Sequence, residues 1–167
     1  MANTHTDSKT CIIIGATGGI GSALAKQLAD AGWSLALCGR DEGKLNSLAG
    51  TLGPAVAGTH AVVATDFDAV DQVVSEHAGA IVAVNFAGSI LLKPAHSTSK
   101  DDFDHTIDQT IRTAFAVTRA AGKSMRKTGG SVVLMSTCAA QIGLPNHEAI
   151  SAAKGAVDGP TPSAAAT

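Results

Sequence analysis

The sequence predicts a three-layer α/β/α domain built on a doubly wound parallel sheet, and three observations lead to that fold class. Stretches with strand and helix patterns alternate five times along the chain. Hydrophobic residues make up 45% of the chain and aromatic residues 3%, which is typical of aliphatic strands buried on both faces. A glycine-rich turn also follows the first predicted strand and opens the first predicted helix.

The order of the predicted elements defines one domain. The strands are expected at Thr10–Ile14, Ser34–Cys38, Ala61–Thr65, Ala80–Asn85 and Ser131–Ser136, and the helices at Gly19–Ala31, Glu42–Leu52, Ala69–His77, Asp101–Lys127 and Glu148–Asp158. Right-handed crossovers between parallel strands give the strand order 3-2-1-4-5, with ligands beyond the carboxyl ends of strands 1 and 4. Residues 1–167 are expected to form this single domain, with a core over 10–158. Pro160 and Pro162 predict an irregular tail over 159–167.

Charge, hydropathy and cysteine spacing exclude several functional classes. A net charge of -2 gives no sign of nucleic-acid binding, and no apolar run approaches the roughly 20 residues that span a bilayer. The polar start Met1–Lys9 lacks the order of a secretory signal, which predicts a cytoplasmic protein. The three cysteines are too scattered for a metal or redox site, and we expect buried free thiols at Cys11, Cys38 and Cys138.

The glycine-rich turn Gly15–Gly21 is the strongest functional signal. It has the spacing G-x-x-x-G-x-G after the apolar run Cys11–Ile14. Glycines at this place let the backbone approach a pyrophosphate, which the N-terminus of the following helix also favours. The alternative is a strand-to-helix turn without a ligand. The residues expected to contact a dinucleotide here are Gly15, Thr17, Gly18, Gly19, Ile20 and Gly21.

The end of the second predicted strand favours NADP over NAD. Sites for NAD usually place a carboxylate here, but this chain has Cys38 and Gly39 followed by Arg40. A guanidinium matches a 2′-phosphate in charge and in geometry. The alternative is a surface arginine, and Asp41 is expected to cap the helix that begins at Glu42.

Two further strand ends carry matching signals. Asp66, followed by Phe67, could accept from the adenine amino group or cap the next helix, and the sequence leaves both readings open. Asn85 can tie the fourth strand to its neighbours. The small residues Ala87 and Gly88 leave room for a ribose beside the backbone.

Together these motifs resemble the short-chain dehydrogenase/reductase family, over Thr10 to about Val157. The segment Asn85–Gly88 stands where the family has Asn-Asn-Ala-Gly. The resemblance implies a Rossmann-type domain that binds NAD(H) or NADP(H) and oxidises alcohols or reduces carbonyls. Family members continue with further strands and a substrate-binding lobe, so we expect the C-terminal part of the family fold to be missing.

The catalytic motif of the family is altered in this chain. The family has Tyr-x-x-x-Lys, in which the phenol exchanges a proton with the substrate and the lysine holds the nicotinamide ribose. Here Ile150 stands in the tyrosine position, Lys154 is kept, and the chain contains no tyrosine. The family serine aligns with Thr137, preceded by Ser136, and the family asparagine aligns with Thr110.

We therefore predict an NADP-preferring oxidoreductase that acts on an alcohol or carbonyl and is catalytically impaired. Loss of a positioned acid–base group typically costs about 10²–10⁴-fold. His147 and Cys138 are alternative reactive groups, whereas Ser151 is expected to point away from the tyrosine position. The other hypothesis is a non-catalytic dinucleotide sensor or a degenerate fragment that a partner completes.

Self-association is also expected. Four residues of the long predicted helix form a stripe at i, i+3, i+4 and i+7 that could serve the core or a partner: Ile111, Ala114, Phe115 and Thr118. The fifth strand would be a sheet edge without a neighbour, which a second copy could cover. The predicted partners are thus a small-molecule cofactor, a small substrate and a second copy of the chain.

Overall fold

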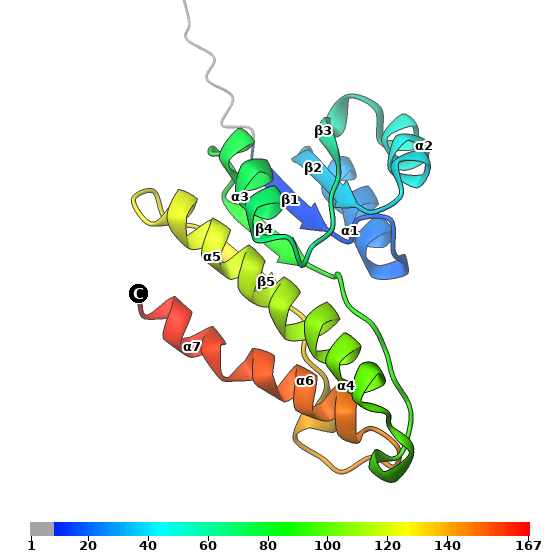
Figure 1. Ribbon diagram of the computed structural model, residues 1–167. Coiled ribbons are helices and arrows are strands. Elements are labelled where there is room, and N and C mark those ends of the chain that lie inside the picture. Colours follow the sequence, from blue (N-terminus) through cyan, green and yellow to red (C-terminus); the bar gives the residue numbers. More distant parts are fainter. Residues whose placement is uncertain (1–8) are drawn as a thin grey trace, which may run out of the picture.

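The computed structural model describes residues 9–167, so the polar start over residues 1–8 lies outside the described residues. Its core is a five-stranded parallel sheet in the order β3-β2-β1-β4-β5, which confirms the predicted topology (Figure 1). The strands are β1 Thr10–Ile14, β2 Ser34–Gly39, β3 Val56–Ala61, β4 Val82–Asn85 and β5 Ser131–Leu134.

Helices pack on both faces of this sheet, and further helices lie beyond it. The helices of the domain are α1 Gly19–Asp30, α2 Glu42–Leu52, α3 Phe67–Glu76, α4 Lys100–Ile107, α5 Thr113–Met125, α6 Glu148–Asp158 and α7 Pro160–Ala165. Alternate residues of β1 point to opposite faces: Ile13 packs with α1 and α2, and Ile12 packs with α3 and α5. The layers are therefore those expected of a doubly wound domain.

The central strand β1 sets the position of the site. Ile14 at its carboxyl end pairs with Cys38 of β2 on one side and with Asn85 of β4 on the other. The chain leaves β1 toward α1 on one face and leaves β4 toward α4 on the other. The carboxyl ends of β1, β2 and β4 consequently meet at one edge of the sheet, where a doubly wound fold binds its ligand.

The third strand lies earlier than predicted. The expected strand Ala61–Thr65 was wrong, because β3 spans Val56–Ala61 and its residues alternate between half-buried and exposed. Such an edge strand carries small and polar residues and lacks a hydrophobic run. The apolar residues that suggested the later position lie in the turn after β3, where Val62 still donates to Gly39 O at 2.8 Å and packs on the core.

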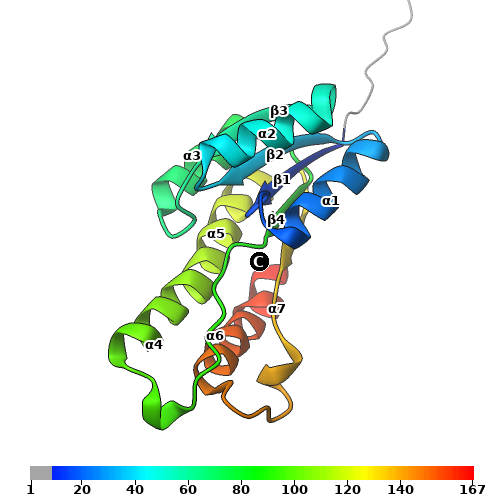
Figure 2. The same cartoon turned by 90° about the vertical axis from the view of Figure 1, so that its right-hand side faces the viewer.

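The long helix predicted over Asp101–Lys127 is present but has a wide turn in its middle. Ser99 begins it with a capping box, in which its hydroxyl accepts from Asp102 N at 3.1 Å. After α4 the chain forms a π-helix over Asp108–Arg112 and then continues into α5. Figure 2 shows α4 and α6 projecting together beyond the sheet.

The predicted helix Glu148–Asp158 is confirmed as α6, but the irregular tail expected over 159–167 was wrong. Gly159 keeps helical backbone angles, φ −59° and ψ −56°, and Pro160–Ala165 forms α7. Proline is tolerated in the first turn of a helix because the N–H it lacks has no partner there. The two prolines therefore start a new helical segment.

Two of the three cysteines are buried, as expected. Burial raises the pKa of the Cys11 and Cys38 thiols to about 12, so both remain protonated at neutral pH. Cys138 is exposed, and the expectation of a buried thiol was wrong there. It follows β5 in a short turn on the surface.

Within residues 9–167, no helix combines the length and hydropathy needed to cross a membrane.

Candidate active site

The glycine turn after β1 is packed so closely that two positions admit only glycine. Gly15 has φ +82°, and a Cβ there would lie 2.8 Å from Ala87 N. A Cβ at Gly21 would lie 2.2 Å from Gly15 O. Gly15 N and Ala16 N both donate to Cys38 O at 2.9 Å. These contacts bring the ends of β1, β2 and β4 together around the turn.

The N-terminus of α1 follows this turn and favours a bound anion. Its N-cap is Gly18, which has no side chain to accept from the helix amides, and its first turn contains no acidic residue. A Cβ at Gly19 would meet nothing within 4 Å, so the space beside the helix start is open. Free amides and the positive end of the helix dipole together suit a phosphate.

The end of β2 places a cation near the same turn. Thr17 Oγ1 would lie 3.3 Å from a Cβ at Gly39, so the first turn and the end of β2 are in contact. Arg40 comes next and is exposed, and it forms no ion pair within residues 9–167. Asp41 caps α2 as predicted, accepting from Lys44 N at 2.9 Å.

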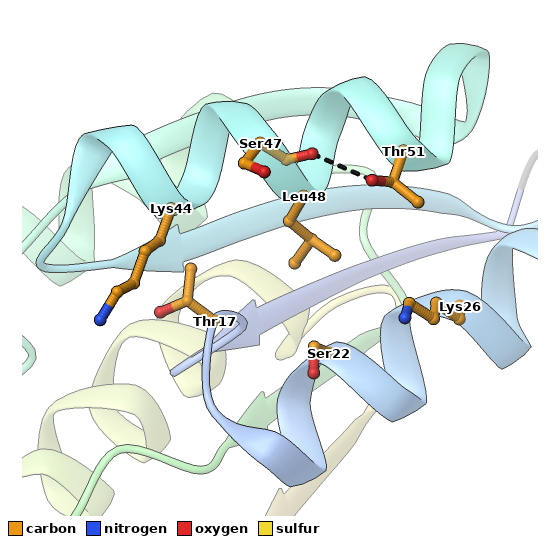
Figure 3. Close-up of a pocket in the computed structure, with 7 residues that line it drawn as sticks. All are labelled: Thr17, Ser22, Lys26, Lys44, Ser47, Leu48 and Thr51. Carbon is orange, nitrogen blue, oxygen red and sulfur yellow. Dashed lines mark hydrogen bonds between the residues drawn. The ribbon is translucent and has the colours of Figure 1, made fainter.

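A pocket of about 270 Å³ lies between α1 and α2, with Thr17 at its end (Figure 3). Lys26 and Lys44 face it from the two helices. Of the predicted cofactor-binding residues, only Thr17 lines it. Its lining residues are Thr17, Ser22, Lys26, Lys44, Ser47, Leu48 and Thr51.

Asp66 was predicted either to cap the next helix or to bind adenine, and in the structure it caps α3. Asp66 Oδ1 accepts from Asp68 N at 3.0 Å and from Ala69 N at 3.1 Å at the start of α3. The ring of Phe67 stacks on Phe115 of α5, with centroids 6.1 Å apart. The Phe67 side chain is therefore committed to packing against α5, and only its backbone remains free for a ligand.

The predicted stripe on the long helix is only partly buried. Phe115 is 50% exposed, whereas Ala114 of the same stripe is buried.

Asn85 is buried at 3% exposure and holds the end of β4 in place. Its side chain accepts from Ala87 N at 3.1 Å and donates to Thr113 Oγ1 at 3.1 Å. Sequence reasoning missed Thr113, whose hydroxyl also lies 2.9 Å from Thr110 O. The only signal was a polar residue among the small and apolar residues of the predicted helix, since nothing in the sequence shows that it meets Asn85.

Lys154 of α6 reaches back to the sheet. Its Nζ donates to Met135 O, just after β5, at 2.8 Å. A Cβ at Gly88 would lie 3.8 Å from this nitrogen, so the segment after β4 and the helix α6 meet here. Burial lowers the pKa of the half-buried Lys154 ammonium below its usual range. The structure thus brings three predicted site segments together.

The position of the family acid is apolar. Ile150, one helical turn before Lys154, is buried at 4% exposure. The two neighbouring hydroxyls have local partners: Ser136 Oγ donates to Lys154 O at 3.2 Å, and Thr137 Oγ1 accepts from Ala139 N at 3.3 Å. No group at the Ile150 position can exchange a proton.

Two buried hydroxyls near this end have no partner. Thr110 Oγ1 lies in the π-helix and Ser89 Oγ lies directly after Gly88. Buried polar atoms without a hydrogen bond are rare in folded proteins and often mark a place where a ligand or water completes the site. Both residues belong to segments that meet near Gly88 and Lys154. This arrangement fits a site that binds a polar group.

The alternative reactive groups lie apart from Lys154. His147 Nδ1 lies 2.7 Å from Pro145 O in the preceding loop, and Cys138 is exposed. Ser151 donates to Ala139 O at 2.8 Å, which anchors α6 to the turn after β5. None of the three hydrogen-bonds to the amine of Lys154, which donates to Met135 O. Within residues 9–167, no group of three or more potential ligand side chains could hold a metal ion.

Comparison with known proteins identifies the family. The model of the short chain dehydrogenase family matches residues 9–167. A D-threitol dehydrogenase of Mycolicibacterium smegmatis is 33% identical over 161 residues, and a sulfoacetaldehyde reductase of Chromohalobacter salexigens is 36% identical over 155 residues. These matches cover 92% and 88% of this chain, and the chain spans 62% of the length of each relative.

Solved structures agree with this assignment. A xylitol dehydrogenase with bound NAD⁺ superposes with a TM-score of 0.87 and 28% identity, over 95% of this chain and 64% of that one. The structure of ElxO with bound NADP has a TM-score of 0.84 at 23% identity, over 91% and 64%, and shows likeness of fold. The glycine turn, the end of β4 and Lys154 occupy one edge of this fold, and the chain belongs to the short-chain dehydrogenase/reductase family of oxidoreductases.

Proposed function

We propose that this chain is an NADP(H)-preferring short-chain dehydrogenase whose conversion between alcohols and carbonyls is strongly impaired. The observation that carries the proposal is the buried Ile150, one turn before Lys154, in a site whose cofactor half is intact. A reduced nicotinamide would supply hydride to a carbonyl carbon. The carbonyl oxygen must also gain a proton. The side chains that would have to donate it belong to α6 and to the segment after β5.

The residues present fit a dinucleotide. Gly15 and Gly21 allow the close packing of the turn, the space beside Gly19 is open to a pyrophosphate, and the uncapped start of α1 would supply amide donors. Lys154 and the segment after Gly88 would bind the ribose next to the reacting ring. Thr17, Gly18, Gly19, Ile20, Asn85 and Ala87 would line the remaining contacts, as the family resemblance implies.

Arg40 supports the choice of NADP. Its guanidinium is exposed at the end of β2 and has no ion pair to break within residues 9–167. A 2′-phosphate would therefore gain charge-assisted hydrogen bonds without displacing an internal partner. Asp66 is engaged in capping α3 through Oδ1, which leaves its second oxygen as the candidate acceptor for adenine.

The missing proton donor limits the chemistry. Ser136 and Thr137 can donate a hydrogen bond to a substrate oxygen, and Lys154 can stabilise negative charge there. Neither hydroxyl has a pKa suited to proton transfer at neutral pH, and the ammonium of Lys154 already donates to Met135 O. We expect slow reduction in which water supplies the proton. The same observation favours one alternative, a non-catalytic dinucleotide-binding or sensor protein that a partner completes.

One experiment separates these functions. NADPH and NADH are titrated by fluorescence, and turnover is then measured with NADPH over a panel of aldehydes and ketones. We expect tighter binding of NADPH and rates far below the ordinary 1–10³ s⁻¹ or so of enzymes. Ordinary turnover would overturn impairment, a complete lack of turnover would favour the sensor, and a lack of cofactor binding would overturn both.

A further inference from the structure

A pair of histidines lies between the edge strand β3 and the end of α3. His60 is the fifth residue of β3, and His77 follows the last residue of α3. Their Nε2 atoms are 2.8 Å apart, and the rings cross at 85° with centroids 5.0 Å apart. Both rings are half-buried, and neither contributes to the dinucleotide site.

Glu76 lies next to the ring nitrogen of His60 that does not face His77. Its Oε2 is 3.6 Å from His60 Nδ1. A carboxylate at this place favours a proton on Nδ1, the tautomer in which Nε2 keeps its lone pair for a cation. Carboxylates orient metal-binding imidazoles in this way, through the nitrogen that does not touch the metal.

His77 presents the same nitrogen from the other side. Its ring is half-buried, and its Nε2 is the atom that faces Nε2 of His60. A neutral imidazole can place its proton on Nδ1 and present the lone pair of Nε2 to a cation.

Gly58 makes room for the two nitrogens. A Cβ at this position would lie 3.0 Å from His60 Nε2 and 3.3 Å from His77 Nε2. Gly58 and His60 are two residues apart on β3 and so share the face that packs against α3. The two nitrogens consequently meet over the one residue of the strand that carries no side chain.

We propose that His60 and His77 bind a first-row divalent cation such as Zn²⁺ through their Nε2 atoms, with Glu76 orienting His60. Zinc–nitrogen bonds are about 2.0–2.1 Å, so two tetrahedral ligands stand about 3.3 Å apart. The pair must open by about half an ångström from its present hydrogen-bonding distance. Water completes the coordination, since no third His, Cys, Asp or Glu within residues 9–167 joins the two. The bound cation would join the edge strand β3 to the end of α3.

The test is calorimetric titration of the untagged full chain with ZnCl₂ at about pH 7.5, where unperturbed imidazoles are neutral. We expect one-to-one binding that His60→Ala and His77→Ala each weaken by at least roughly tenfold, and that Glu76→Gln weakens by about tenfold. His105→Ala, an exposed histidine on α4, is the matched control and should leave the affinity unchanged.

Gly58→Ala keeps both ligands and tests the geometry, because its methyl group occupies the space between the nitrogens. It should weaken Zn²⁺ binding while the protein stays folded by circular dichroism. A second readout is the electron paramagnetic resonance spectrum of bound Cu²⁺, which should show hyperfine coupling to two nitrogens and lose it in His77→Ala. Absence of binding, or equal binding by the wild-type chain and both histidine variants, would overturn the proposal and leave an ordinary hydrogen bond.

Discussion

The glycine turn after β1 and the helix α6 form the two halves of the candidate site. The turn has the glycines that the family motif requires, whereas α6 lacks the proton donor. In the turn, backbone contacts leave Gly15 and Gly21 no freedom to change, since a Cβ at either would lie within 3 Å of neighbouring backbone. In α6, Ile150 fills the position of a proton donor and packs well. An apolar residue can therefore occupy an acid–base position while the fold around it remains intact, because acid–base groups add little to packing.

The largest expected effect comes from restoring the missing group. Ile150→Tyr should raise the rate of carbonyl reduction by about 10²–10⁴-fold, the usual contribution of a positioned acid–base group. The matched control is Ile150→Phe, which brings the ring without the hydroxyl. Steady-state assays with NADPH compare the two. Equal rates for the two variants would show that α6 does not present residue 150 to the substrate.

The glycine turn should tolerate change at one position and not at another. Gly21→Ala places a methyl 2.2 Å from Gly15 O, so it should cost about 1–3 kcal/mol of unfolding free energy and abolish detectable cofactor binding. Gly19→Ala is the control, because its Cβ would meet nothing within 4 Å. Urea denaturation and fluorescence titration measure both effects. Normal cofactor binding by Gly21→Ala would contradict the assigned turn.

Arg40 should decide between the two cofactors. Arg40→Ala should weaken NADPH binding by roughly tenfold, the effect of one or two charge-assisted hydrogen bonds, and leave NADH binding unchanged. Arg126→Ala, an exposed arginine at the end of α5, is the matched control. A parallel loss for both cofactors would mean that Arg40 acts on the fold of the β2 end.

The smallest effect separates the two roles of Asp66. Asp66→Ala should lower the free energy of unfolding by about 1 kcal/mol, because the amides of Asp68 and Ala69 lose their cap. Asp66→Ser keeps a capping oxygen and removes only the carboxylate. If Asp66 also binds adenine, the serine variant should be stable but bind NADPH more weakly, as thermal denaturation and titration will show.

The parts of the fold that could be predicted are the elements whose own residues carry a clear local pattern. The apolar β1 and the capped α2 have strong local patterns, and their predicted bounds agree with the structure. The edge strand β3 lacks a hydrophobic run, and α7 begins with a proline that local rules treat as a breaker. In both cases the structure of the segment depends on the element next to it. The residues of the segment itself do not indicate that neighbour.

The site divides in the same way. Gly15 is recognisable from the spacing of the glycine turn, and Lys154 was singled out only by the resemblance to the family motif. The contacts that position the site join segments far apart in the chain, such as Asn85 with Thr113 and Lys154 with the carbonyl of Met135. A backbone acceptor can be supplied by any residue, so the sequence holds no trace of it.

The π-helix over Asp108–Arg112 has a consequence for changes of length in this protein. A π turn holds one more residue than an α turn and returns the chain to the same face. Thr106 before it and Ala114 after it are both buried. Removal of one residue within the turn would leave α4 and α5 facing as they do, whereas removal within α5 would rotate every later side chain by about 100°. The π turn is thus a place where the long helix can lose one residue without changing its buried face, and it lies beside Gly88.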